Sequence, residues 1–286
     1  MSAPTLYPTS IDGVIRAPGE GRIASDDPGF LLGLAVYDTL LYERGCVYFE
    51  EQHLARLESG ARALSIRWPL RWDVSRELER YTRELGSRDC AVRITVTRGA
   101  PGAGASLVIG ARDILRAPEP GITVVLVPGA KLARDPLENV KCTSRVRNVL
   151  AREAAMASGA FEALLCTNEG DVSEGTQSNV FARVDGRVVT PALERGALAG
   201  IMRAEVLSAL RASGRDALEG RLEVADLARA SEVFLTSTTG RVMPVIEVRN
   251  SVRGLPGAQG ELARDLRARI AAREDEYRRS RAKARG

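Results

Sequence analysis

Residues 141–184 read KCTSRVRNVLAREAAMASGAFEALLCTNEGDVSEGTQSNVFARV, and this stretch carries the pattern that decides the fold. RVRNVLAREAAMASG has the composition of a helix that ends at Gly159. EALLC and NVFARV are apolar enough to be strands, and the polar, glycine-containing loop VSEGTQSN separates them. This succession of helix and strands predicts an α/β (α+β) fold.

The alternation of helices and strands continues toward the C-terminus. Asp185-Gly186 before RVVTP predicts a hairpin, and a second helix is expected from Gly200 to about Gly214. Strand EVFLT, a Ser-Thr-Thr-Gly loop, strand VMPVIEV and a C-terminal helix complete this half of the chain.

Toward the N-terminus, IDGVIR (11–16) and CVYF (46–49) are expected to be strands, and EEQHLARLESGARAL a helix. Asp73 is expected to cap the helix DVSRELERYTREL, and two strands follow, the second being SLVIG. Residues 111–121, ARDILRAPEPG, have the prolines and glycine of a linker. We therefore predict two mixed domains, 1–118 and 119–286, with Lys141 in the second.

Histidine and lysine are scarce. Of 41 basic residues three are lysine, which leaves 41 − 3 = 38 arginines, and His53 is the single histidine. One imidazole excludes sites that need two, such as a histidine-rich zinc centre, and leaves one possible Ser-His-Asp triad. Arginine cannot supply an amine that deprotonates or forms a Schiff base, so each lysine merits inspection.

Charge, cysteine content and hydropathy favour an intracellular protein. The 37 acidic residues are interleaved with the basic ones and aromatics make up 5%, which argues against a nucleic-acid binder. Four scattered cysteines and no apolar run of about 18 residues predict a reducing cytoplasm and no membrane span. The basic stretch from Arg278 to Arg285 is either a solvated helix end or a tail that binds a partner.

Lys141 and Glu174 are the first candidates for chemistry. Lys141 lies between an apolar-to-polar transition and a helix, where side chains reach clefts, although a surface lysine without a chemical role is the alternative. With a pKa of about 10.4, a free amine is mostly protonated and a poor nucleophile until burial or imine formation changes it. Glu174 lies in a loop where the chain must turn, and is either a solvated acid or a positioned carboxylate.

The start of the helix after Gly200 offers backbone N–H groups to an anion, and Thr238 and Thr239 could add hydroxyl groups. Any helix start would do this, so the feature is weak alone. Together, however, a lysine for a Schiff base, a carboxylate for a ring nitrogen and an arginine with a helix start for a phosphate match the needs of pyridoxal phosphate.

The chain resembles the fold-type IV (class IV aminotransferase) pyridoxal-phosphate enzymes, which include branched-chain and D-amino acid aminotransferases and aminodeoxychorismate lyase. The resemblance runs in order through nearly the whole chain, and its most specific parts are the lysine with an asparagine seven residues later, E-G-x-x-S-N, G-I-M-R and S-T-T. The motifs that carry it are IDGVI, GLAVYDTL, QHLARL, VTRG, VKCTSRVRNVLAREAAMASG, EALLCTNEGDVSEGTQSNVF, GRVVTP, LAGIMR and LTSTTGRVMPV.

The resemblance implies a role for particular residues. Lys141 would be the Schiff-base lysine and proton shuttle, and Glu174 the partner of the pyridine nitrogen. The phosphate would be bound, by the same resemblance, by Arg56, Ile201, Met202 and Thr238. Tyr37 would line the substrate side, and no metal is implied. His53, one helical turn from Arg56, is expected to pack or form a hydrogen bond near the site and not to act as a general base.

The resemblance leaves the reaction open between two activities. Branched-chain enzymes commonly have a tyrosine where Val146 stands, and the R-x-H carboxylate trap of D-amino acid enzymes is missing after Arg98. The segments VYDTL and GIMR favour the lyase, yet lyases often have an arginine where Ala103 stands. The first expectation is an aminotransferase acting on an amino donor and a 2-keto acid, the second is aminodeoxychorismate lyase, and a homodimer is implied for either.

Overall fold

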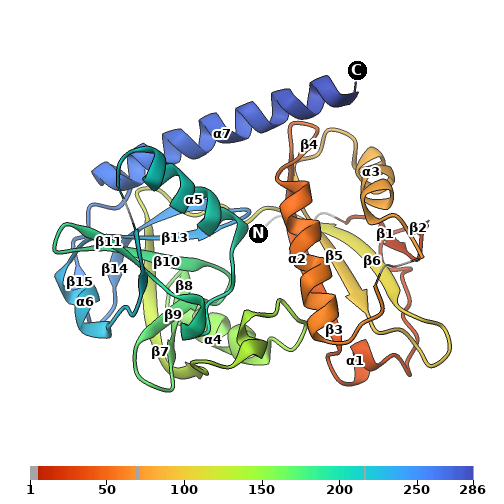
Figure 1. Cartoon of the computed structure of the whole chain (residues 1–286), viewed down its shortest axis with the longest axis horizontal. Helices are drawn as coiled ribbons and strands as arrows, with labels where there is room; N and C mark the ends of the chain where they lie inside the picture. The colour runs from red at the N-terminus through yellow and green to blue at the C-terminus, as the bar shows by residue number, and fades with distance from the viewer. Residues whose placement is uncertain (1–5, 69–70, 216, 286) are drawn as a thin grey trace. The chain divides into compact units, whose positions relative to one another are not determined.

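A computed structural model describes residues 6–68, 71–215 and 217–285 (Figure 1). By its internal contacts the chain forms two compact units. Unit 1 runs to Leu115 and includes Val140–Ser144 and the chain from Tyr277 onward, whereas unit 2 contains Arg116–Asn139 and Arg145–Glu276. Each unit combines a sheet with helices, so the expected mixed α/β architecture is confirmed.

Unit 1 is built on a six-stranded sheet in the order β2-β1-β6-β5-β3-β4, and every neighbouring pair is antiparallel. Helix α2 packs on β3 and crosses one face of the sheet (Figure 1). The described elements are β1 (Thr9–Ile11), β2 (Val14–Arg16), α1 (Pro28–Leu31), β3 (Ala35–Glu43), β4 (Cys46–Val47), α2 (Glu50–Ala63), α3 (Val74–Leu85), β5 (Cys90–Thr97) and β6 (Ser106–Arg112).

Helices α2 and α3 form where the sequence predicts them, whereas the short helix α1 was not predicted. In α3 the buried residues recur at helical spacing, from Val74 through Leu78 to Leu85, and Asp73 caps the helix by accepting from the Arg76 N–H at 3.2 Å. Helix α2 buries His53, Leu57 and Ala61 in the same way. Both helices thereby close a core with the aliphatic side chains of β3, β5 and β6.

Three features of unit 1 differ from the expectation. IDGVIR forms two short strands rather than one, because the chain turns at Asp12 and Gly13, both with positive φ. CVYF is a strand only at Cys46–Val47, and Phe49, at φ 55°, leads directly into α2. The nine-residue strand β3 was not expected, because it is buried along most of its length and lacks the alternation of a half-exposed strand.

Unit 2 is built on a mixed sheet in the order β12-β11-β10-β13-β14-β7-β8-β9, and β15 pairs with β14. The pairs β7–β8, β14–β7 and β11–β12 are parallel. The described elements are β7 (Ile122–Lys131), η1 (Pro136–Asn139), α4 (Val146–Ala157), β8 (Glu162–Thr167), β9 (Val172–Gly175), β10 (Asn179–Val184), β11 (Arg187–Pro191), η2 (Leu193–Arg195), α5 (Ile201–Ala212), β12 (Ala217–Gly220), α6 (Val224–Arg229), β13 (Ala230–Ser237), β14 (Arg241–Val248), β15 (Val252–Arg253), η3 (Gly257–Gln259) and the start of α7 (Glu261–Arg285).

The local predictions for this half hold in most places. The expected hairpin is β10–β11, and its turn residues Asp185 and Gly186 have φ of 48° and 81°, as a two-residue hairpin turn requires. Helices α4 and α5 begin and end near their predicted limits. Part of the predicted loop VSEGTQSN is instead strand β9, and all four residues of that strand are buried.

The compact units do not follow a single cut in the chain. Val140–Ser144 groups with unit 1 because the Tyr37 N–H donates to the Lys141 carbonyl and the Thr143 N–H to the Ala35 carbonyl, both at 2.9 Å. The last turns of α7 also belong to unit 1, where Arg281 forms salt bridges with Glu50 and Glu51. Part of the basic stretch is thus paired within the chain, while the division into domains 1–118 and 119–286 stays a prediction.

Candidate active site

Lys141 lies beside the beginning of β3 in unit 1. The segment around it runs antiparallel to β3, with Val36 paired to Cys142 and the Tyr37 N–H bonded to the Lys141 carbonyl. The Lys141 Nζ is 4.8 Å from the centroid of the Tyr37 ring, and the Arg93 guanidinium carbon is 3.7 Å from the same ring. Two predicted site residues, Lys141 and Tyr37, are therefore in contact as a cation and an aromatic ring.

Arg56 is held in place by a buried carboxylate one residue after Tyr37. Its Nε donates to Asp38 Oδ2 at 2.8 Å and its Nη2 to Asp38 Oδ1 at 2.7 Å, a bidentate pair. The Nδ1 atom of His53 is 2.8 Å from Asp38 Oδ1. Asp38 and His53 are both fully buried, so strand β3 and helix α2 are joined by a polar cluster of three side chains.

The electrostatics of this cluster decide its protonation. Burial alone would raise the pKa of Asp38, but the Arg56 guanidinium and the His53 hydrogen bond outweigh it and hold that pKa well below its usual range. Burial lowers the pKa of His53, and the positive charges of Arg56 and Lys141 add to this, against the opposing effect of Asp38. His53 is therefore neutral near pH 7, and we assign its proton to Nδ1, where it donates to Asp38.

Glu174 lies in strand β9 of unit 2, and its side chain is buried rather than exposed in a loop. Its Oε1 accepts from the Lys131 Nζ at 2.9 Å, and its Oε2 accepts from the Leu198 N–H at 2.8 Å. The amide of Asn179 lies 3.5 Å from Oε2. The carboxylate is thus fixed by groups from three separate segments of the chain.

Gly200 caps the N-terminus of α5, which begins at Ile201. A side chain at this position would lie 2.0 Å from Asn179 Oδ1, so only glycine permits the close approach. Asn179 in turn donates to the Leu198 carbonyl at 2.8 Å. Gly200 has no side chain to bond the first N–H groups of α5, which leaves the positive end of the helix dipole available to an anion.

The remaining predicted residues of unit 2 lie on adjoining elements. Ile201 and Met202 form the first turn of α5, and Met202 is buried. Thr238 is half-buried in the turn between β13 and β14, and α5 packs on β13. These positions agree with the elements on which the sequence placed them, and their role toward a phosphate stays a prediction.

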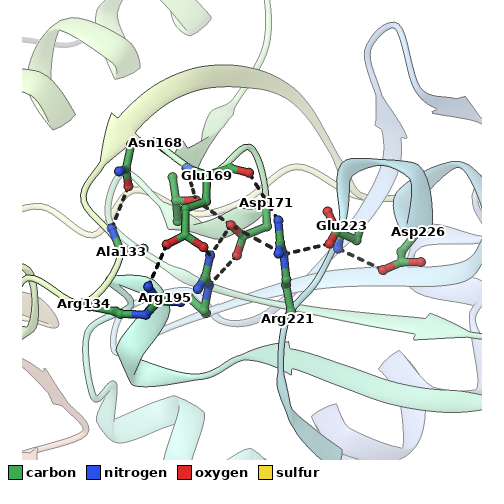
Figure 2. A network of polar contacts seen from close by, with 10 residues as sticks. Ala133, Arg134, Asn168, Glu169, Asp171, Arg195, Arg221, Glu223 and Asp226 are labelled. Atoms are coloured by element: carbon green, nitrogen blue, oxygen red, sulfur yellow. Dashed lines mark hydrogen bonds and ion pairs between the residues drawn. The ribbon is translucent and has the colours of Figure 1, made fainter.

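A network of ion pairs joins the β8–β9 turn to the segment before α5 (Figure 2). Arg195 in η2 donates from Nε to Asp171 Oδ2 at 2.7 Å and from Nη2 to Glu169 Oε2 at 2.8 Å. Burial would raise the pKa of Asp171, but hydrogen bonds from Arg195 and Thr167 lower it overall. The network fixes the β8–β9 turn and the turn at η2. Glu174 lies three residues after Asp171, and Leu198 lies three residues after Arg195.

Sequence reasoning missed several of these side chains, among them Asp38, Lys131 and Arg195. Lys131 had a usable signal, because it is one of three lysines in the chain. Asp38 had a weaker one, a single acid within the apolar run AVYDTLLY. Within the part of the chain that the structure describes, no group of three or more His, Cys, Asp or Glu side chains could hold a metal ion. The described helices also include none that is long and apolar enough to cross a membrane.

Comparison with known proteins bears on this architecture. Residues 35–248 match the family model for amino-transferase class IV. A putative branched-chain-amino-acid aminotransferase of Methanocaldococcus jannaschii is 29% identical over 82% of this chain and 85% of its own. A D-alanine aminotransferase of Bacillus licheniformis is 28% identical over 91% of this chain and 94% of its own.

Solved structures agree on the fold. The crystal structure of a branched-chain aminotransferase from Thermoproteus uzoniensis with norvaline superposes with a TM-score of 0.82, at 23% identity, over 96% of this chain and 97% of that one. The family model spans both compact units and includes Tyr37, Arg56, Lys141, Glu174 and Thr238. The chain therefore belongs to the amino-transferase class IV family.

Proposed function

We propose that the protein moves an amino group between an amino acid or amine and a 2-keto acid, with pyridoxal 5′-phosphate as cofactor. Class IV aminotransferases use this cofactor, which when bound supplies the electron sink that stabilises negative charge at the substrate α-carbon. The protein contributes an amine, a carboxylate and phosphate-binding groups. Whether these groups suit the cofactor can be judged from their charge, burial and hydrogen bonds.

The residues present fit the cofactor. The uncapped start of α5 at Ile201 and Met202 offers backbone N–H groups suited to a phosphate, and Arg56 offers a guanidinium held rigidly by Asp38. Thr238 would add a hydroxyl group. Glu174 is a buried carboxylate that accepts from Lys131 and Leu198, and a carboxylate is the group that favours a protonated ring nitrogen.

In this proposal Lys141 attaches the cofactor and carries protons to and from the reacting carbon. The flat ring of Tyr37, in contact with the Lys141 ammonium, would line the substrate side and restrict where that amine can move. Asp38 and neutral His53 act indirectly, because they fix the direction of the Arg56 guanidinium. No imidazole is needed as general base, since the amine serves in that role.

The observation that carries the proposal is the group of residues around Lys141. One of only three lysines in the chain lies against the Tyr37 ring and close enough to His53 to lower its pKa together with Arg56. The amine and the phosphate-binding guanidinium proposed for one cofactor thus belong to the same compact unit.

A substrate panel tests the reaction itself. The purified protein with added pyridoxal phosphate should transfer amino groups from amino acids or amines to 2-oxoglutarate or pyruvate, and the Lys141→Ala protein should not. Release of 4-aminobenzoate from aminodeoxychorismate, without amino transfer to any keto acid, would favour the lyase instead. Absence of both reactions and of cofactor binding would contradict the proposal.

We further propose that the protein is a cytoplasmic homodimer. Helix α4 turns its alanines toward the sheet and leaves large apolar side chains exposed, and α1 exposes three consecutive ones. These exposed residues are Val146, Val149, Leu150 and Met156 on α4 and Phe30, Leu31 and Leu32 at α1. Apolar surface of this kind is typical of subunit interfaces. Light scattering should give about twice 30.8 kDa, and a monomer mass would refute the dimer.

All four cysteines are free thiols, which supports the proposed location in a reducing compartment.

A further inference from the structure

Lys131, at the end of β7, is a buried amine between two carboxylates. Its side chain is 1% exposed, and its Nζ is 2.9 Å from Glu174 Oε1 and 2.7 Å from Glu138 Oε2. Glu174 is as deeply buried as the lysine, whereas Glu138 is 19% exposed and anchored by the Leu132 N–H to its Oε1 at 3.2 Å. All three side chains belong to unit 2.

The Glu174 carboxylate has acceptor positions left for one more hydrogen-bond donor. A carboxylate accepts at about four positions. Lys131 occupies a position on Oε1, and Leu198, with a longer contact from Asn179, occupies Oε2. The groups that hold Glu174 therefore leave part of its acceptor capacity unused.

The charge of the cluster decides which donor is favoured. Glu138, Glu174 and Lys131 together carry two negative charges and one positive charge, a net charge of −1 in a buried setting where unpaired charge is costly. One additional cation brings the cluster to neutrality. The pyridinium N–H of the cofactor is such a cation.

We propose that Lys131 is a positioning residue of the active site, which together with Glu138 sets the charge available to the cofactor's ring nitrogen. This inference rests on the proposed function, because it assumes that Glu174 faces that nitrogen. Glu138 offsets the lysine, so that Lys131 orients Glu174 without cancelling its negative charge. A lysine facing Glu174 alone would leave a neutral pair with little preference for a protonated ring.

Removal of the charge of Lys131 or of Glu138 changes the net charge of the cluster around Glu174. Lys131→Met leaves two neighbouring carboxylates with a charge of −2 and without the amine between them, so Glu174 loses the partner that orients it. Glu138→Gln leaves a neutral Lys131–Glu174 pair that no longer favours a cation. The double variant removes one charge of each sign and restores −1 on Glu174.

The experiment is a double-variant cycle with four readouts. Each protein is measured for affinity toward pyridoxal phosphate, for the ¹⁵N chemical shift of the ring nitrogen of bound labelled cofactor, for kcat and KM, and for urea unfolding without cofactor. Lys283→Met, which changes the exposed third lysine, is the matched control.

We expect about a tenfold or greater weakening of cofactor binding in each single variant, from the loss of one partner in a buried ion pair. The ring nitrogen should lose protonation in both, and kcat should fall more than KM changes. The double variant should recover the protonated ring nitrogen and most of the affinity, and Lys283→Met should match the wild type.

Two outcomes would overturn the inference. A double variant at least as impaired as Lys131→Met would assign the lysine to packing alone, and single variants with an unchanged ring-nitrogen shift would show that the cluster has no influence on the cofactor. If the wild-type protein binds no pyridoxal phosphate, the proposed function fails before this cycle begins. If it binds and only the cycle fails, the proposed function stands and the role of Lys131 does not.

Discussion

At the scale of single residues, the cluster of Asp38, His53 and Arg56 shows how burial and charge select protonation states. Asp38 stays ionised because Arg56 and His53 outweigh the cost of its burial. His53 stays neutral because burial and two nearby cations outweigh its contact with Asp38. An ionised acid, a neutral imidazole and a guanidinium then form one chain of hydrogen bonds.

His53 should make the stability of the protein dependent on pH. Its pKa is lowered on folding from an ordinary value near 6.5, so the unfolded chain binds the proton more readily, and stability falls as pH drops below about 6.5. One such group contributes a slope of at most about 1.4 kcal/mol per pH unit. Asp38 adds a loss of stability at more acidic pH, as pH falls below the ordinary aspartate value.

His53→Asn isolates this contribution, because the asparagine amide can still donate to Asp38 but does not titrate. Urea unfolding of both proteins between pH 7.5 and 5 should give a smaller decline in the free energy of unfolding for the variant. Parallel declines in the two proteins would show that His53 does not titrate as described.

At the scale of elements, the pair of Asp171 and Arg195 joins the β8–β9 turn to the segment before α5 (Figure 2). Strand β9 with Glu174 follows the first turn, and Leu198, which donates to Glu174, follows Arg195. The pair is buried, and Arg195 also donates a hydrogen bond to Glu169. The position of Glu174 therefore depends on the ion pair between Asp171, three residues before Glu174, and Arg195, three residues before Leu198.

Arg195→Ala should leave the buried Asp171 without its main partner, which typically costs about 3–5 kcal/mol of unfolding free energy. Because the same pair positions Glu174 and Leu198, affinity for pyridoxal phosphate should fall as well. Thermal and urea unfolding, together with cofactor titration, provide the measurement.

Arg134→Ala is the matched control, since this arginine also contacts Glu169 but its side chain is 73% exposed. It should change both quantities little. Equal losses in Arg134→Ala and Arg195→Ala would contradict the special role of the buried pair.

At the scale of the whole molecule, helices and hairpins could be predicted from the sequence, whereas contacts between residues far apart in the chain could not. Helices α3, α4 and α5 and the β10–β11 hairpin follow from periodicity, caps and turn residues within short windows. Strand β3 has no such pattern because most of it is buried on both faces. The grouping of Val140–Ser144 with unit 1 depends on hydrogen bonds to residues more than 100 positions away, which no local window contains.

The candidate site divides in the same way. The resemblance to a family named Lys141, Glu174, Arg56 and Tyr37, because those residues recur in recognisable motifs. Lys131 was not assigned to the site, because its partner Glu174 lies 43 residues away and the scarcity of lysine does not reveal that pairing. The positions of Glu174 in a strand and of Lys141 beside β3 likewise required the structure.

In the proposed function Lys141 holds the cofactor, and the scarcity of lysine permits a direct test of this role. Protein incubated with pyridoxal phosphate, reduced with borohydride and digested with trypsin should contain a phosphopyridoxyl group on residues 135–145, DPLENVKCTSR, with cleavage after Lys141 blocked. Lys131 and Lys283 should remain unmodified, and Lys141→Ala should carry no label. A label on either of the other two lysines with Lys141 unmodified, or no label at all on a protein that transfers amino groups, would contradict the account.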